Sequence, residues 1–196
     1  MKRLASSLAF AASMLALPAF AATTTYSAVA SGPAEAVPDP SPGYSIATIV
    51  LDDTANTLSV SSPFQNLLGN STMAHIHAGT PEPFMGTAPV AVKFMDFPTG
   101  VKSGDYSMTF NLLDATIYGA DFLSANGGSV TAARDALIGD INDHRAYLNI
   151  HTDLYPAGEI RGFLVASPVP EPGSYAMLAV GLAGVGFAAR RKRSAT

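Results

Sequence analysis

Two short stretches decide the fold: Ala-His-Ile-His-Ala-Gly at residues 74–79 and Tyr-Leu-Asn-Ile-His-Thr at residues 147–152. Both alternate polar and apolar side chains with a period of two residues, which is typical of a β-strand with one face against a core. On such a strand His75 and His77 point to one face, because successive side chains alternate between faces. By the same alternation, His151 ends the polar face of the second stretch.

The rest of the middle of the chain also predicts short strands separated by turns. Residues 31–43 are rich in proline and glycine and predict a loop after an N-terminal strand, the two together covering residues 22–43. Strands are predicted at 44–51, 57–62, 73–77, 89–94, 106–112, 146–151 and 159–165. Ser129 can cap one helix, in which apolar residues recur at helical spacing from Val130 to Ile141. The pattern predicts a mainly β fold, a β-sandwich or barrel with one short helical insertion. An immunoglobulin-like sandwich has this architecture, and the His-x-His strand at 75–77 resembles that of copper/zinc superoxide dismutase, so the expected fold is immunoglobulin-like or superoxide-dismutase-like.

The N-terminal end has the three parts of a secretory signal peptide over residues 1–21. Two basic residues follow Met1, an apolar stretch covers residues 4–17, and small residues stand at Ala19 and Ala21. The apolar stretch is too short to span a bilayer comfortably, so we expect cleavage after Ala21 rather than a membrane anchor. The expected partners are the Sec translocon and signal peptidase.

The C-terminal end predicts a second sorting signal over residues 169–193. A Val-Pro-Glu-Pro segment precedes a charge-free apolar stretch at 173–189, which is at the short edge of what spans a bilayer as a helix. The basic cluster behind it should stay cytoplasmic and leave the domain outside. The residues of this signal are Val169, Pro170, Glu171, Pro172, Arg190, Arg191, Lys192 and Arg193.

These C-terminal residues resemble the PEP-CTERM sorting signal, which is found in Gram-negative bacteria that make exopolysaccharide and biofilm. The resemblance implies a membrane protease of the exosortase type as a partner, which would remove the helix near Pro170–Pro172. The helix would then be a transient tether. The expected location is the inner membrane in transit, followed by the periplasm, the cell surface or the medium.

Charge is distributed unevenly along the chain, which has no cysteine and a net charge of −4. Six of the eleven basic residues belong to the two ends, so the middle holds five basic and fourteen acidic residues, a formal charge of −9. Such a domain repels phosphate backbones and anionic headgroups. We therefore expect no nucleic-acid partner, and membrane contact only through the C-terminal helix.

The histidine-containing stretches resemble the CHRD domain, a family named for its repeats in chordin. Three segments carry the resemblance: His-Ile-His-Ala-Gly at 75–79, Asn-Ile-His-Thr at 149–152, and Pro-Ala-Gly-Glu-Ile-Arg-Gly at 156–162. It spans most of residues 24–166 and implies a β-sandwich domain over that range. The family implies architecture more firmly than activity.

Three histidines suggest a metal site, and the alternative is that they have a purely structural role. If the two strand faces meet, His75, His77 and His151 would hold copper or zinc with an open coordination position. Otherwise the histidines belong to a structural polar network that includes Asn149, Thr152, Asp153, Glu159 and Arg161. An enzymatic centre is the third alternative, and the lack of a nucleophile elbow, phosphate loop or metalloprotease helix in the sequence argues against it.

The expected function is that of a non-enzymatic, exported envelope domain associated with exopolysaccharide or the biofilm matrix after processing. The alternative is a secreted copper- or zinc-binding domain for metal handling or redox protection. A copper-dependent oxidoreductase is the third hypothesis.

Overall fold

The computed structural model describes residues 23–167 and 180–183. The predicted signal peptide with Ala19 and Ala21, and the sorting residues at 169–172 and 190–193, lie outside that part of the chain. Of the predicted membrane helix, only a helical turn at 180–183 is described. Within these two ranges, no helix is both long enough and apolar enough to cross a bilayer.

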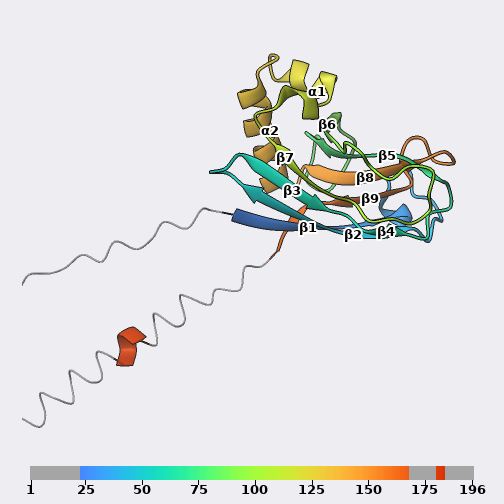
Figure 1. The fold of residues 1–196 in the computed structure, drawn as a ribbon, viewed down its shortest axis with the longest axis horizontal. Helices are drawn as coiled ribbons and strands as arrows, with labels where there is room; N and C mark the ends of the chain where they lie inside the picture. Colours follow the sequence, from blue (N-terminus) through green and yellow to red (C-terminus); the bar gives the residue numbers. More distant parts are fainter. Residues whose placement is uncertain (1–22, 168–179, 184–196) are drawn as a thin grey trace, which may run out of the picture.

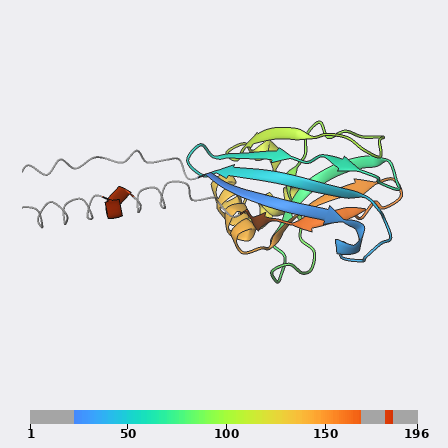
Figure 2. The ribbon, with the colours of Figure 1, turned by 90° about the horizontal axis from the view of Figure 1, so that it is seen from below.

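The described residues form one antiparallel sheet that curls into a half-barrel (Figures 1 and 2). The main path runs β6-β5-β8-β9-β1-β2-β3-β7, with β10 paired to β1 and β4 paired to β2. The strands are β1 (Thr23–Ser31), β2 (Tyr44–Asp52), β3 (Thr57–Ser61), β4 (Phe64–Gln65), β5 (Ser71–Ala78), β6 (Val90–Lys93), β7 (Ser107–Asn111), β8 (Ala146–Thr152), β9 (Ile160–Phe163) and β10 (Val165–Ala166). The prediction of a mainly β fold is confirmed.

Strands β1, β2, β3 and β7 bury one face against the core. Along β2 buried and exposed positions alternate, and Ile49 and Leu51 point inward. Their cross-strand neighbours in β3, Val60 and Leu58, are also buried. Burying each of these side chains fully contributes about 1.5–3 kcal/mol. The alternation in the sequence therefore fixes which face of this half of the sheet meets the core.

The helices lie together at one end of the sheet (Figure 1). The predicted helix is α2 (Val130–Asn142), and the Ser129 hydroxyl accepts a hydrogen bond from the N–H of Ala132 at its start. Short 3-10 turns occur at Gly32–Ala34 (η1) and Ala115–Ile117 (η2). A second helix, α1 (Ala120–Ala125), was not predicted, because its six residues are too few to show helical periodicity.

Strands β8 and β9, and the C-terminal half of β5, differ from the rest because their outward face is covered as well. All seven residues of β8 are buried, including Asn149 and His151. The cover consists of three loops, at residues 32–43, 79–89 and 153–159, which bond to polar side chains on the outward face. The candidate site lies beneath these loops, on the side of the sheet opposite the apolar core.

Candidate metal centre

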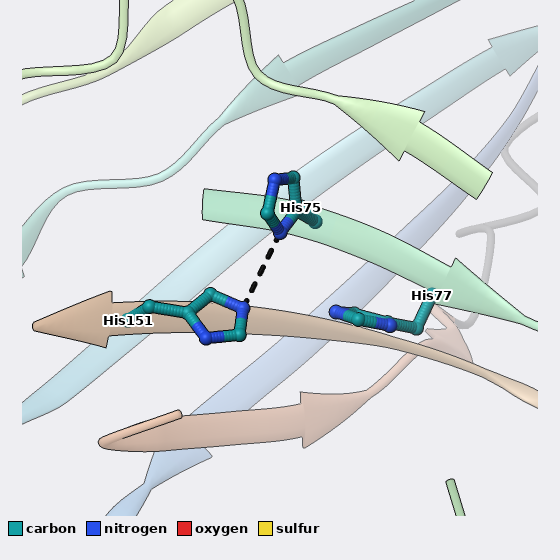
Figure 3. A group of neighbouring side chains, drawn as sticks. All are labelled: His75, His77 and His151. Carbon is teal, nitrogen blue, oxygen red and sulfur yellow. Dashed lines mark hydrogen bonds between the residues drawn. The ribbon is translucent and has the colours of Figure 1, made fainter. Parts of the chain in front are cut away.

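The three histidines proposed as ligands converge on the outward face of the sheet (Figure 3). His75 and His77 come from β5, and His151 comes from the adjacent strand β8. One ring nitrogen of each lies within 4.8 Å of the corresponding nitrogen of the other two. His77 and His151 are buried, and His75 is half-buried.

Backbone carbonyls fix the orientation of two of the rings. The Nδ1–H of His77 donates to the carbonyl of Ala88 at 2.8 Å, and the Nδ1–H of His151 donates to that of Pro156 at 3.0 Å. Each bond leaves a lone pair on Nε2, the arrangement that a metal-binding histidine requires. The covering loops therefore act as the outer support of the site.

His75 completes the cluster through its Nδ1 atom. This atom lies 3.3 Å from Nε2 of His151, so in the absence of metal His75 donates and His151 accepts. A bound metal ion would occupy the position of the proton on Nδ1 of His75, and the neutral ring would carry its proton on Nε2 instead. With metal–nitrogen bonds of about 2.0–2.1 Å, tetrahedral ligands lie about 3.3 Å apart, which matches this pair. The ligand nitrogens that lie farthest apart, within 4.8 Å of each other, would approach to this distance through a small side-chain rotation.

His77 has a buried ring nitrogen that the described part of the chain leaves without a hydrogen bond. Its Nε2 is buried and has no hydrogen-bond partner among the described residues. Leaving a buried polar group without a partner costs about 1–3 kcal/mol. This atom is free to accept a metal ion, so the residues present are compatible with one.

Burial keeps the three imidazoles neutral. It lowers the pKa of His75 to about 4, with further contributions from His151, His77 and Lys93. Burial likewise lowers the pKa of His77 to about 4, against the opposing effect of its bond to Ala88. The pKa of His151 is also lowered, again mainly by burial. Neutral imidazole is the form that binds metals.

Tyr147 and Arg161 build the wall beside His77. The Tyr147 ring stacks on the His77 ring at 4.8 Å with an interplanar angle of 3°, and the guanidinium of Arg161 lies 5.0 Å from the Tyr147 centroid. Arg161 also donates to the carbonyls of Ala34 at 2.6 Å and Gly86 at 2.8 Å. One side chain thus holds two covering loops against the sheet.

Glu35 is a buried acid that sequence analysis did not single out. Its Oε1 accepts from the side-chain amide of Asn149 at 2.5 Å. Burial raises its pKa to about 7, although Arg161 and Asn149 oppose the rise. Gly158 is required here, because its φ is +130° and a Cβ would lie 2.9 Å from Oε1 of Glu35. Glu35 stands in a loop without periodicity, so no sequence pattern marks it.

Glu159 forms a separate network away from the histidines. Its carboxylate accepts from the Ser41 hydroxyl at 2.5 Å, the N–H groups of Leu68 at 2.5 Å and Gly69 at 3.0 Å, and the Thr152 hydroxyl at 2.8 Å. Burial acts to raise its pKa, but these hydrogen bonds outweigh burial and lower it. Glu159 therefore ties three loops together as a buried carboxylate.

The other residues of the predicted polar network bond to different partners, some near Glu35 and Arg161 and some near Glu159. Asp153 accepts from the N–H of Asn70 at 2.8 Å and from its side-chain amide at 3.0 Å, at an exposed position. Asn149 bonds to Glu35, Thr152 to Glu159, and Arg161 to the covering loops. The structure places these five residues around the site in separate groups rather than in one network with His151.

Comparison with known proteins agrees with this architecture. The model of the CHRD domain matches residues 26–164, which is well over half of the chain, and that of the PEP-CTERM protein-sorting motif matches residues 168–193. Neither the curated proteins nor the solved structures include a significant match. The sorting motif points to an exported protein that transits the membrane and is processed by exosortase-type machinery. The chain belongs to the CHRD-domain family.

Proposed function

We propose that this exported domain binds one copper or zinc ion through Nδ1 of His75, Nε2 of His77 and Nε2 of His151. Two observations carry the proposal: one ring nitrogen of each histidine lies within 4.8 Å of the others, and Nε2 of His77 is buried without a hydrogen-bond partner among the described residues. The large majority of buried side-chain polar atoms are hydrogen-bonded, so a buried nitrogen without a partner requires an explanation. Three protein ligands leave a fourth position open.

The fourth histidine of the chain provides a matched control. The His144 ring stacks on Phe84 with centroids 4.7 Å apart, and its Nδ1 lies 3.4 Å from the carbonyl of Leu164. It is outside the three-histidine cluster. The His144→Ala and His77→Ala variants therefore remove the same chemical group, but only His77→Ala removes a proposed ligand.

The test is metal analysis of the full chain purified from the cell envelope and dialysed against copper or zinc at neutral pH. We expect about one ion per chain in the wild type and in His144→Ala, and none in His77→Ala. Absence of bound metal from the wild type would overturn the proposal, as would equal metal content in the two variants.

We further propose that the domain binds metal without catalysing a reaction. Support comes from the sequence, in which no nucleophile elbow, phosphate-binding loop or metalloprotease helix is found. The assay is superoxide dismutation by copper-loaded protein. We expect no rate above that of His77→Ala under the same conditions, and a metal-dependent rate above it would contradict this assignment.

For its final location, we propose release from the membrane after processing and association with the exopolysaccharide matrix. The match to the sorting motif at residues 168–193 supports this proposal. Fractionation of cells with antibody against the domain provides the test. We expect matrix-associated protein that lacks the basic cluster at 190–193, whereas recovery of the intact tail from surface protein would argue against it.

A further inference from the structure

An exposed methionine stands beside the three histidines on the same face of the sheet. Met73 precedes His75 by two residues in β5 and pairs directly with His151 in β8. Directly opposed residues in antiparallel strands have Cβ atoms about 4.5–5.5 Å apart. Met73 is nevertheless 48% exposed, although methionine is a residue that proteins normally bury. Its thioether is thus within reach of the side of the cluster that is open to solvent.

A second exposed methionine follows β6 at the same edge. The N–H of Phe94 bonds to the carbonyl of Ala74, so the next residue, Met95, leaves the sheet alongside Met73. The hydroxyl of Tyr106 donates to the Met95 carbonyl at 3.0 Å and holds the backbone there. Met95 is 44% exposed. The backbone therefore places Met95 beside Met73, next to the candidate metal centre.

The charges around the cluster favour an ion of low charge. The three ligands are neutral, and no carboxylate belongs to the described cluster. Lys93 pairs with His75 across β5 and β6, and Arg161 lies over the Tyr147 ring that stacks on His77, where Glu35 offsets part of the charge of Arg161. The cost of desolvating an ion rises with the square of its charge, and neighbouring cations add repulsion in proportion to charge. Both effects penalise a divalent ion more than a monovalent one.

We infer that the ion held by this centre is Cu(I), with Met73 as a thioether ligand beside the three histidines and Met95 as the outer contact through which Cu(I) enters. The inference rests on the metal-binding function proposed above. Soft thioether ligands select Cu(I) over Zn(II), which prefers nitrogen, thiolate and carboxylate donors. Cu(I) also carries the single positive charge that the surroundings favour.

The decisive variants replace each methionine with leucine, which keeps nearly the same volume and removes only the sulfur. Met73→Leu and Met95→Leu are compared with Met85→Leu, a control at an exposed methionine in the loop between β5 and β6. The full chain from the cell envelope is loaded anaerobically. Cu(I) affinity is measured by competition with bathocuproine disulfonate, Zn(II) affinity in parallel, and the ligands by X-ray absorption.

We expect Met73→Leu to weaken Cu(I) binding by about tenfold or more. Loss of a residue that only supports a metal ligand already lowers metal affinity by about that factor, and loss of a ligand should cost at least as much. Zn(II) affinity should stay within about threefold, and the sulfur signal in the copper spectrum should disappear. Met95→Leu should slow Cu(I) loading at unchanged affinity, and Met85→Leu should match the wild type. A loading rate equal to the wild type would remove Met95 from the inference.

Failure of this inference differs from failure of the proposed function. If Zn(II) or Cu(II) binds and is lost in His77→Ala, but Met73→Leu binds Cu(I) as the wild type does, the centre exists and its assignment to Cu(I) and Met73 is wrong. If no metal binds the wild type, the centre itself is wrong.

Discussion

Nδ1 of His75 and Nε2 of His151 lie 3.3 Å apart, on adjacent strands and 76 residues apart in the chain. This separation matches that of two ligands on one tetrahedral ion with bonds of about 2.0–2.1 Å. Because β5 and β8 are neighbours, an ion at this point would join two strands that the chain connects only through a long excursion. Metal binding and the stability of the domain should therefore be coupled.

Removal of metal should destabilise the protein. A ligand that binds only the folded state at a free concentration of 1,000 times its Kd adds about 4 kcal/mol to the free energy of unfolding. We expect a chelator to reverse this gain in urea denaturation of the metal-loaded protein. The His75→Ala/His151→Ala double variant is the control and should be insensitive to metal. An equal metal-induced gain in that variant would place the ion elsewhere.

Glu159→Gln should destabilise the domain by about 2–4 kcal/mol, because two groups that donate to one oxygen of the carboxylate would face an amide N–H instead. The measurement is the midpoint of urea unfolding at neutral pH. Glu82→Gln, at an exposed position, is the matched control and should change stability by less than about 0.5 kcal/mol. Similar midpoints for the two variants would show that the Glu159 network contributes little.

Arg161→Lys should loosen the cover over the metal centre. Lysine has no planar fork and cannot reproduce both bonds to the carbonyls of Ala34 and Gly86, so we expect a loss of about 1–3 kcal/mol. Hydrogen exchange in the loop at 79–89 should become faster. Arg134→Lys is the control for loop protection, since its partners Asp53 and Asp135 both lie outside the covering loops. Unchanged protection of the loop in Arg161→Lys would count against this role.

Glu35→Gln should gain stability relative to the wild type as pH rises. Burial raises the pKa of Glu35 in the folded protein from 4.5 to about 7, so its carboxyl contributes stability that is present below pH 4.5 and lost as pH rises through 7. Arg161 and the hydrogen bond from Asn149 act to lower the pKa of Glu35, and Asp39 acts to raise it. Glu35 in turn raises the pKa of Tyr147. Glutamine stays neutral throughout.

The measurement is chemical unfolding of both proteins between pH 4 and 8. The difference in free energy of unfolding should change in favour of Glu35→Gln over the interval from 4.5 to 7 and level off above it. A difference that is independent of pH would show that Glu35 titrates as an exposed acid.

The sequence by itself determined the local features. The period of two residues placed His75 and His77 on one face of a strand, because backbone pleating fixes that relation without regard to the rest of the fold. Similarly, the hydroxyl of Ser129 and the apolar spacing behind it were enough to locate α2, since a helix start depends on groups within one turn. The sorting signals at the two ends could be recognised because each consists of contiguous residues.

Only the tertiary structure decided that His151 joins the other two histidines. The pairing of β5 with β8 depends on how the whole core packs, and strands so far apart in sequence have no local pattern that names their partner. The same holds for the carbonyls of Ala88 and Pro156, which orient two of the rings. Every residue has a carbonyl, so its position, and not its identity, makes it part of the site.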